Sequence, residues 1–355
     1  MRNSHDFIRS ISSLIEYLKE SGIDTKTAHI EDLIEHPFSL LIPKYYADLI
    51  DWRDSDDPLR KMILPDKLEH EVKDYELADP IGDAVCSPTP GVVHRYPDRC
   101  LLMLTNVCAV HCRFCFRKNI LDTNGAHLDK ALAYIRAHIE IWEVIFSGGD
   151  PFMFTDHFIN SIVSKIRRIP HVKMIRFHTR TPIVYPQKVT PNLLASLQNA
   201  GPCSVVLHVN HPREITPAFI AVVSKMRTAG ALILSQTVLL KGVNDHEKIL
   251  GELFKKLVES GVKPYYLHHL DLTKGTHHFR ISVARGKEII QKLRGTISGL
   301  CMPEYVIDTP GGYGKIPVFW FSQIAKHTYE AVGFEGRKII YKDTGLFYRK
   351  IIPQT

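Results

Sequence analysis

Short apolar runs alternate with amphipathic segments along most of the chain after Pro97. Runs of this kind predict β-strands, and apolar residues repeated at three- and four-residue intervals predict helices. The predicted strands cover residues 101–105, 144–146, 173–178, 204–209, 232–238 and 263–268. The predicted helices cover residues 128–139, 156–166, 191–197, 217–228, 247–259 and 282–293, and Thr190 is a candidate cap before the third.

The order of these elements predicts the fold class. Six strand–helix units in a row favour a parallel sheet with right-handed crossovers. We therefore expect an α/β protein whose sheet curls into a partial (β/α)6-type barrel. In such folds the active site lies at the carboxyl ends of the strands.

The two ends of the chain differ from this pattern. Near the start, Gly22 follows a run with helical spacing that is formed by Phe7, Ile8, Ile11, Leu14, Ile15 and Leu18. Residues 51–80 are charged and rich in Pro and Asp, which predicts an irregular connector. We expect an α-helical N-terminal extension over residues 1–80, the barrel core over 81–300 and a short C-terminal segment over 301–355.

Composition narrows the class of protein. Apolar residues make up 45% and charged residues 23% of the 355, which is typical of a globular protein with a large core. The net charge of +7 is dispersed, so we expect no nucleic-acid partner. No apolar run approaches the roughly 18 residues of a membrane span, so we expect no membrane partner either. The seven cysteines are an odd number and the start lacks a secretory pattern, which favours a cytoplasmic protein.

Three of the cysteines follow the first predicted strand at Cys-x3-Cys-x2-Cys spacing, as Cys108, Cys112 and Cys115. Three thiolates on one loop can bind three irons of a [4Fe–4S] cluster and leave the fourth iron open to another ligand. A zinc ion is the alternative. Structural zinc takes four protein ligands, however, and no paired Cys-x2-Cys follows downstream. The spacing therefore favours the cluster.

Two glycine-rich segments complete the set of motifs. The first follows the second predicted strand and contains Ser147, Gly148, Gly149 and Asp150. Glycines let backbone groups approach a ligand that a Cβ would block. The second covers residues 308–317 and carries Lys315, which suits phosphate binding or a Schiff base with an aldehyde cofactor. It is not a P-loop, because the Gly-x4-Gly-Lys-Ser/Thr spacing is missing.

Together these motifs resemble the radical S-adenosylmethionine (SAM) superfamily and, within it, the lysine 2,3-aminomutase family. The resemblance covers roughly residues 80–318 and includes Phe114 before the last cysteine of the motif. Residues 310–315, here called the lysine loop, carry Tyr313 where the family pattern has a third glycine. The resemblance implies a radical SAM barrel with a [4Fe–4S] cluster on the three cysteines and SAM on the open iron.

The resemblance also implies roles in binding the organic cofactors. SAM would contact Ser147, Gly148, Gly149 and Asp150. Lys315 would hold pyridoxal 5′-phosphate (PLP) as a Schiff base, and Arg95 would hold its phosphate, for which a guanidinium fork is well suited. The shared cofactor pocket would be lined by His208, Asn210 and Gln236.

For the substrate, the resemblance implies an amino acid with a positively charged side chain. Arg117 would bind its carboxylate, and Asp271 and Asp308 would hold the distal ammonium of lysine. Two carboxylates suit a buried ammonium and would repel a glutamate side chain. The implied enzyme is an isomerase that converts L-lysine to β-lysine by a PLP-assisted 2,3-amino shift, started by a 5′-deoxyadenosyl radical.

Several further expectations accompany this function. A reducing donor such as flavodoxin or ferredoxin would supply the electron, and a homo-oligomer is compatible with the sequence. No cysteine follows Cys301, so the chain resembles a compact form without the C-terminal zinc-binding cysteines of longer members. The branch that supplies β-lysine for elongation factor P modification is one alternative, and an amino shift on another amino acid is a second.

Two interpretations from other classes stay open at this point. In the first, the chain is a radical SAM enzyme without PLP, and Lys315 is structural. In the second, the chain is a zinc-dependent nucleic-acid-binding protein, which its basic charge suggests.

Overall fold

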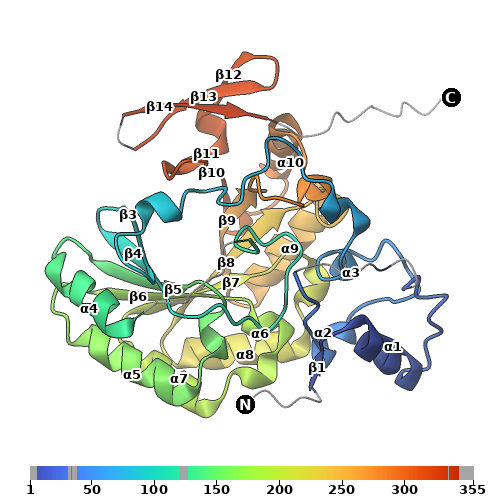
Figure 1. Cartoon of the computed structure of the whole chain (residues 1–355), viewed down its shortest axis with the longest axis horizontal. Coiled ribbons are helices and arrows are strands. Elements are labelled where there is room, and N and C mark those ends of the chain that lie inside the picture. The colour runs from blue at the N-terminus through green and yellow to red at the C-terminus, as the bar shows by residue number, and fades with distance from the viewer. Residues whose placement is uncertain (1–5, 31–32, 34–37, 120–126, 335, 344–355) are drawn as a thin grey trace.

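The computed structural model describes residues 6–30, 33, 38–119, 127–334 and 336–343 (Figure 1). Its centre is a nine-stranded sheet in the order β11-β10-β9-β8-β7-β6-β5-β4-β3. Strands β4 to β10 run parallel, whereas β3 and β11 pair antiparallel at the two edges. The strands are β3 (Val92–Tyr96), β4 (Arg99–Met103), β5 (Glu143–Ser147), β6 (Met174–Thr179), β7 (Cys203–His208), β8 (Leu232–Leu239), β9 (Lys263–His269), β10 (Glu304–Thr309) and β11 (Gly314–Pro317).

The six predicted strands are present as β4 to β9, so the predicted α/β barrel is confirmed. The hydrophobic pattern does not predict β3, β10 or β11. The edge strands β3 and β11 are short and carry several half-buried residues, and the apolar run of β10 is only Tyr305 to Ile307. β10 nevertheless adds a seventh parallel strand, because it pairs with β9 over Glu304 to Val306.

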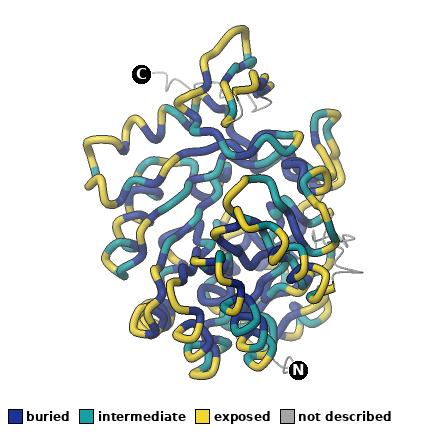
Figure 2. The backbone as a smooth tube through the Cα atoms, turned by 90° about the vertical axis from the view of Figure 1, so that its left-hand side faces the viewer, coloured by how far each residue is buried: buried dark blue, intermediate teal, exposed yellow. Residues whose placement is uncertain are grey.

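The helices pack around this sheet. Figure 1 shows α4, α5, α7 and α8 along one side of it, and Figure 2 shows buried backbone in the interior with exposed segments around it. All six predicted helices are confirmed, and Thr190 does cap α7 by accepting from the Leu193 N–H. The helices of the barrel are α4 (Leu128–Ala137), α5 (Asp156–Arg167), α6 (Thr181–Val184), α7 (Pro191–Asn199), α8 (Pro217–Thr228), α9 (Glu247–Glu259) and α10 (Val283–Leu293). Short 3₁₀ helices cover Lys67–His70, Ala84–Cys86, Pro151–Met153, Pro186–Lys188, Pro212–Glu214, His277–Phe279, Gly299–Cys301 and Val318–Trp320.

The residues before the barrel are helical only in part. They form β1 (Phe7–Ile8), α1 (Ile11–Glu20), β2 (Ile42–Pro43), α2 (Lys44–Ala47) and α3 (Pro58–Lys61). The expectation that Phe7 and Ile8 are helical is wrong, because both pair antiparallel with β2. The helix begins at Ile11, since the Ser10 hydroxyl accepts from the Ser13 N–H. Residues 51–80 are mostly irregular, as predicted.

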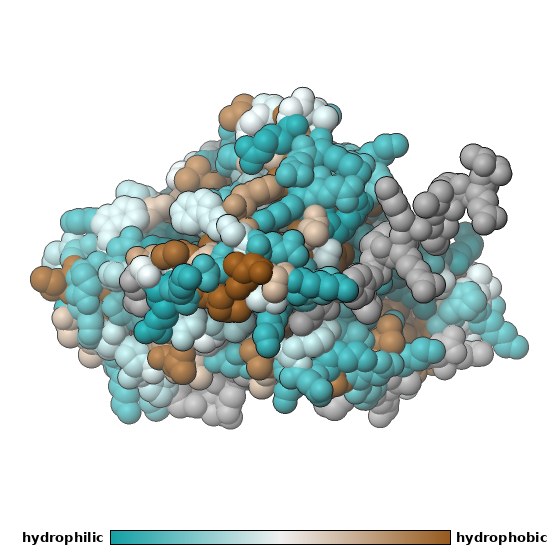
Figure 3. Space-filling view, turned by 90° about the horizontal axis from the view of Figure 1, so that it is seen from above, coloured by the Kyte–Doolittle hydropathy of each residue, from teal (hydrophilic) through white to brown (hydrophobic). Residues whose placement is uncertain are grey.

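A second, three-stranded antiparallel sheet follows the barrel. It consists of β12 (Ser322–Ala325), β13 (Thr328–Val332) and β14 (Lys338–Lys342), in that order. Seen from above, the surface of this side is mainly hydrophilic with separate hydrophobic patches (Figure 3). No helix among the described residues is long and apolar enough to cross a membrane.

Side chains and glycine turns nearly close the barrel between its two edge strands. The Tyr96 hydroxyl on β3 accepts from the Lys315 N–H on β11 at 2.7 Å. Gly82 packs against the turn before β11, and a Cβ on Gly82 would lie 2.4 Å from the Gly312 nitrogen. Gly82 has a φ of +71°, a conformation that favours glycine. The position of the lysine loop therefore depends on contacts with residues more than 200 positions earlier.

We predict that Gly82→Ala destabilises the chain more than Gly22→Ala does. Gly22 has a similar φ of +69°, but a Cβ added there would have nothing within 4 Å. Backbone strain alone should lower the free energy of unfolding by about 1–2 kcal/mol in both variants. The close approach to Gly312 should add about 1–3 kcal/mol in Gly82→Ala. Guanidinium unfolding measures both, and equal losses would contradict the role of the contact.

Candidate active site

The carboxyl ends of the parallel strands surround a cavity of about 320 Å³. Residues near these ends line it, including Ser147 of β5, His208 of β7 and His268 of β9. The cavity is within the size range of small-molecule sites. Its place at this end of the barrel is the one that the fold class predicts.

Cys108, Cys112 and Cys115 lie on the loop after β4, and all three line the cavity. Each is half-buried and free of disulfides. Burial raises the pKa of the Cys115 thiol to about 11, so its thiolate needs a positive partner such as iron. No group of three or more His, Cys, Asp or Glu within the described ranges is arranged to hold a single metal ion.

Buried ion pairs hold this loop in place. Arg113 donates from Nε and Nη2 to the two carboxylate oxygens of Glu69, at 2.8 and 2.7 Å, and both side chains are fully buried. Lys118 Nζ lies 3.3 Å from Glu69 Oε2 and donates to the Gly275 carbonyl at 2.9 Å. The Arg113 N–H donates to the Met62 carbonyl. The cysteine loop is therefore fixed to the N-terminal segment and to the loop after β9.

Arg180, which the sequence analysis does not single out as a site residue, contacts the cysteine loop directly. Its Nη1 donates to Cys112 Sγ at 2.7 Å, and its Nη2 donates to Glu214 Oε1 at 2.8 Å and to the Tyr46 hydroxyl at 3.2 Å. Burial disfavours the charge, but Cys112 and Glu214 outweigh it and hold the Arg180 pKa well above its usual value. A permanent positive charge therefore lies beside the cysteine loop. The local sequence around Arg180 gives no sign of this contact.

The glycines after β5 serve the packing of the cysteine loop. A Cβ on Gly149 would lie 2.5 Å from the Val107 carbonyl oxygen, and a Cβ on Gly148 would lie 2.8 Å from that of Thr105. The Gly149 N–H donates to Thr105 and the Asp150 N–H to Val107, at 2.7 and 2.8 Å. Both glycines line the cavity. The sequence predicts that these glycines let a ligand approach the backbone. In the structure they also let the loop after β5 pack closely against the loop after β4.

Asp150 lies at the cavity wall, but its carboxylate is used by the protein. It accepts from the Thr179 hydroxyl at 2.7 Å and from the N–H groups of Arg180 and Thr181 at 2.8 and 2.9 Å. It also accepts from the Phe152 N–H at 3.0 Å. This carboxylate joins the end of β5 to the end of β6, which positions Arg180.

Arg95 and Arg117, the two arginines predicted to bind anions, share one carboxylate. Asp83 Oδ1 accepts from Arg95 Nη2 at 2.9 Å, and Asp83 Oδ2 accepts from Arg117 Nε at 2.9 Å. Arg117 Nη1 also donates to the Ser147 hydroxyl at 3.0 Å. All three charged side chains are nearly buried. Sequence reasoning misses Asp83, which lies in an irregular segment without a motif.

Lys315, Asp308 and Asp271 lie together at another part of the cavity wall. Lys315 Nζ is 2.9 Å from Asp308 Oδ1, and His268 Nδ1 is 3.2 Å from Asp308 Oδ2. Burial opposes ionisation of Asp308, but Lys315 and His268 outweigh it and lower its pKa. Burial and the charge of Asp308 raise the pKa of Asp271 to about 8. One of the two carboxylates is therefore ionised and the other protonated near neutral pH.

Comparison with known proteins agrees with this geometry. Residues 102–254 match the Radical SAM superfamily. The chain is 42% identical over 284 residues to L-lysine 2,3-aminomutase of Clostridium subterminale, which covers 79% of this chain and 68% of that protein. It is 38% identical over 336 residues to L-lysine 2,3-aminomutase of Fusobacterium nucleatum, which covers 93% of this chain and 78% of that protein. The chain belongs to the lysine 2,3-aminomutase family.

Membership establishes the class of enzyme. The protein is a radical SAM aminomutase, an isomerase, and its cofactors are a [4Fe–4S] cluster, SAM and PLP. For this chain, membership therefore implies a [4Fe–4S] cluster rather than a zinc ion. The relatives of the chain act on more than one amino acid. Glutamate 2,3-aminomutase of Clostridioides difficile is 35% identical over 318 residues, which covers 88% of this chain and 72% of that protein.

The cavity of this aminomutase fits polar cofactors. Several fully shielded polar atoms in its wall have no hydrogen-bond partner in the protein, namely Arg95 Nε, His178 Nε2, Arg180 Nε, His208 Nε2 and Asp271 Oδ1. Buried polar atoms without partners are rare, since each costs about 1–3 kcal/mol. These atoms are therefore available to a bound polar group.

The remaining predicted pocket residues divide into two groups. His208 and Gln236 line the cavity, and burial lowers the His208 pKa well below its usual value, so its ring is neutral. Asn210 is not among the lining residues. It is fully buried, and its Oδ1 accepts from the Val238 N–H while its own N–H donates to Glu214. In the structure Asn210 therefore joins β7 to β8.

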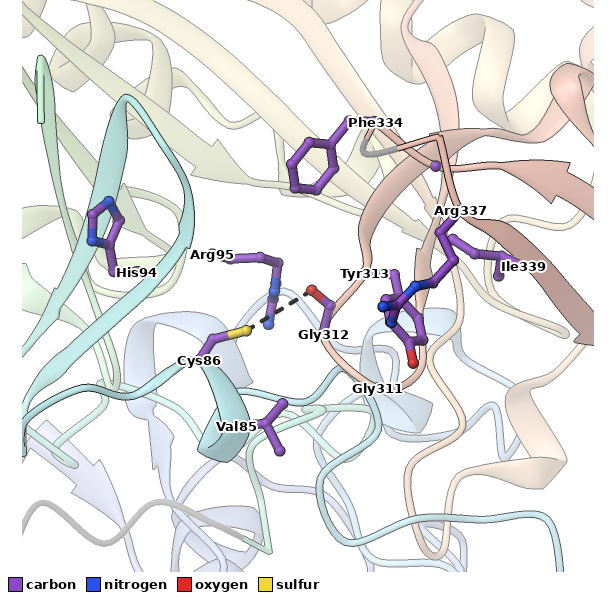
Figure 4. A pocket seen from close by; sticks show the side chains of 11 residues that line it. Val85, Cys86, His94, Arg95, Gly311, Gly312, Tyr313, Phe334, Arg337 and Ile339 are labelled. Atoms are coloured by element: carbon purple, nitrogen blue, oxygen red, sulfur yellow. Dashed lines mark hydrogen bonds between the residues drawn. The ribbon is translucent and has the colours of Figure 1, made fainter. Parts of the chain in front are cut away.

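A second cavity, of about 280 Å³, adjoins the first and shares Arg95 with it (Figure 4). The Gly311–Gly312 turn forms one side of this cavity, with φ values of +85° and +87°. Cys86 Sγ lies 3.8 Å from the Gly312 carbonyl oxygen, which ties the turn to the segment before β3. This second cavity is therefore lined both by the glycine turn that leads to Lys315 and by Arg95, the arginine predicted to bind the PLP phosphate.

The raised pKa of Asp271 predicts a pH-dependent stability of the ligand-free chain. Between about pH 4 and pH 8 the folded chain binds the Asp271 proton and the unfolded chain does not, because the unfolded pKa is near 3.8. The free energy of unfolding should therefore fall as pH rises, by up to about 1.4 kcal/mol per pH unit from this group. Urea unfolding at several values from about pH 6 to 8 should show a flatter profile in Asp271→Asn. The exposed Asp129→Asn is the control, and an equal change of slope in both variants would refute the assignment.

Proposed function

We propose that the substrate of this aminomutase is L-lysine and that the product is β-lysine, with PLP held at Lys315. The observation that supports this choice is the charge distribution in one cavity. Two arginines that share a single carboxylate line this cavity together with two aspartates. Lysine carries a carboxylate and a distal ammonium, and it matches both.

The arginine part of the wall keeps a positive charge. The two guanidinium charges of Arg95 and Arg117 and the one carboxylate charge of Asp83 leave a net charge of +1 among these three groups. Anionic groups are therefore stabilised here. We assign the substrate carboxylate to Arg117 and the PLP phosphate to Arg95, whose Nε has no partner in the protein. Asp83 keeps both guanidinium groups in fixed orientations.

The aspartate part of the wall suits a cation. Asp271 Oδ1 is fully shielded and has no hydrogen-bond partner, and Asp308 lies close enough to raise the Asp271 pKa. An ammonium between the two would stabilise the ionised form of both, because opposite charges favour ionisation. A carboxylate side chain at the same place would be repelled. We therefore favour lysine over glutamate.

Residues of the chain also fix the positions of Lys315 and of the cysteine loop, where the cofactors would be held. When bound, the cofactors supply a radical that removes a hydrogen atom and a carbonyl group that holds the migrating amino group. The Tyr96 hydroxyl fixes the Lys315 backbone at 2.7 Å, and Gly314 allows this approach, since a Cβ there would lie 2.6 Å from the same oxygen. Cys112 and Arg180 lie on the cavity wall at the cysteine loop. The barrel thus keeps the lysine loop and the cysteine loop around one cavity, which limits the access of water to reactive intermediates.

Substrate choice is tested directly by anaerobic turnover. Reconstituted protein with SAM, PLP and a reductant is given either L-lysine or L-glutamate, and the β-amino acid product is detected by mass spectrometry. We expect kcat/KM for lysine to exceed that for glutamate by about 100-fold or more, because the aspartates repel the glutamate side chain. Turnover of glutamate without turnover of lysine would refute the proposed substrate.

The role of Asp308 is tested by Asp308→Asn. Loss of one partner of a buried charge pair costs about 2–5 kcal/mol, so kcat/KM for lysine should fall about 30-fold or more. Iron content should stay unchanged, because Asp308 does not contact the cysteine loop in any described interaction. Asp98→Asn, an exposed carboxylate beside Arg99, is the control. Equal loss of iron and activity in Asp308→Asn would show a structural role instead.

A further inference from the structure

The carboxylate of Asp83 extends from a backbone that is itself fixed. The Asp83 N–H donates to Asp79 Oδ1 at 2.9 Å, and the Ala84 N–H donates to Asp79 Oδ2 at 2.8 Å. The Ser87 hydroxyl donates to the Asp83 carbonyl at 2.7 Å. The Asp83 side chain is only 4% exposed. Asp83 therefore holds its two arginines from a defined position.

The segment around Asp83 also packs against the lysine loop. A Cβ on Gly312 would lie 3.4 Å from the carbonyl oxygen of Gly82, the residue before Asp83. Cys86 Sγ lies 3.8 Å from the Gly312 carbonyl oxygen. Residues 79–86 therefore contact both the lysine loop and the two arginines.

Both arginines have donors left while they are paired with Asp83. A guanidinium has five N–H donors. Arg95 uses Nη2 for its bonds to Asp83 and to the Ile81 carbonyl, and its Nε has no partner in the described part of the protein. Arg117 uses Nε for Asp83 and Nη1 for the Ser147 hydroxyl. Each arginine can therefore bind a further anion without leaving Asp83, so the shared carboxylate belongs to the occupied site as well.

A shared carboxylate also sets the distance between two guanidinium groups. Without it, two buried like charges would repel each other, since little water is present to screen them. During the reaction the cofactor carbonyl group holds the substrate amino group, so the phosphate and the substrate carboxylate belong to one joined molecule. Covalent bonds limit the separation of these two anions. Two arginines bind both anions at once only where their own separation matches.

We propose that Asp83 is a positioning residue that sets the spacing of Arg95 and Arg117 to match the phosphate and the carboxylate of the joined cofactor and substrate. The proposal rests on the proposed function, which assigns these two anions to these two arginines.

This role differs in sign from a role in charge balance alone. Loss of the Asp83 charge raises the net charge at this place from +1 to +2, which by itself strengthens the binding of any anion. Loss of the correct spacing instead weakens the binding of a ligand that carries both anions. A ligand with only the phosphate does not require the spacing.

Two stable ligands separate these effects without turnover. The first is phosphopyridoxyl-L-lysine, in which a C–N single bond joins the reduced cofactor to the α-nitrogen of lysine. The second is phosphopyridoxyl-1,5-diaminopentane, which has the same phosphate and distal ammonium but no carboxylate. Calorimetry measures Kd for both with the full-length, cluster-loaded chain free of PLP, since each ligand supplies its own pyridoxyl group. The native chain is compared with Asp83→Asn, with Asp83→Ala as a second variant and the exposed Asp129→Asn as the control.

We expect Kd for the lysine ligand to rise about tenfold or more in Asp83→Asn and Asp83→Ala, because both variants lose the bridge between the arginines. Kd for the diaminopentane ligand should fall or change less than about twofold, since one anion does not require the spacing. Asp129→Asn should leave both values unchanged, and iron content verifies that each variant is folded.

Three results would contradict the proposal in different ways. An equal or lower Kd for the lysine ligand in both Asp83 variants would leave only charge balance and overturn the positioning role. An equal rise of Kd for both ligands would show a structural role and overturn it as well. Equal affinity of the native chain for the two ligands, or no binding of either, would overturn the assignment of the substrate carboxylate to Arg117 and the positioning role together.

Discussion

The pairing of buried charges is the constraint on which this active site depends. An ion moved out of water costs several kcal/mol unless a partner of opposite charge and further hydrogen bonds compensate it. Glu69, Asp83, Glu214 and Asp308 are carboxylates of this kind, and each contacts two side chains from other segments. The pairs that compensate the charge also fix the cysteine loop, the arginines, the ends of the strands and the lysine loop around one cavity.

The same pairs determine the net charge of the groups that line the cavity. Asp83 neutralises one of its two arginines, so that part of the wall stays positive. Asp271 and Asp308 share the single charge of Lys315, so their part of the wall accepts a further cation. Under the proposed function, a site with both features binds the carboxylate and the distal ammonium of lysine. The enzyme class follows from family membership, whereas we propose that the choice among amino acids depends on these few incomplete pairings.

Local sequence patterns predict the helices and strands that bury one apolar face. They fail for residues whose surroundings come from segments distant in the sequence. The strands β4 to β9 and the helices between them follow from periodicity, because each buries its own apolar residues. The edge strands and the placement of Phe7 and Ile8 depend on pairing partners instead. Asp83 has no motif around it and gains its role from arginines 12 and 34 positions later. Asn210 has a polar side chain near a strand end, yet it joins two strands and does not line the cavity.

The local sequence is enough to identify the chemical groups of the site and their approximate order along the barrel. Three thiols at fixed spacing, a Gly-Gly turn and a lysine on a glycine loop are local features, so they are visible without a structure. The identity of the charges that neutralise each other becomes visible in the folded chain, because ion pairs such as Asp83 with Arg117 form between segments that are distant in the sequence. The tertiary structure also decides that Lys315 faces Asp308, since that contact follows from the register of two strands and not from either strand alone.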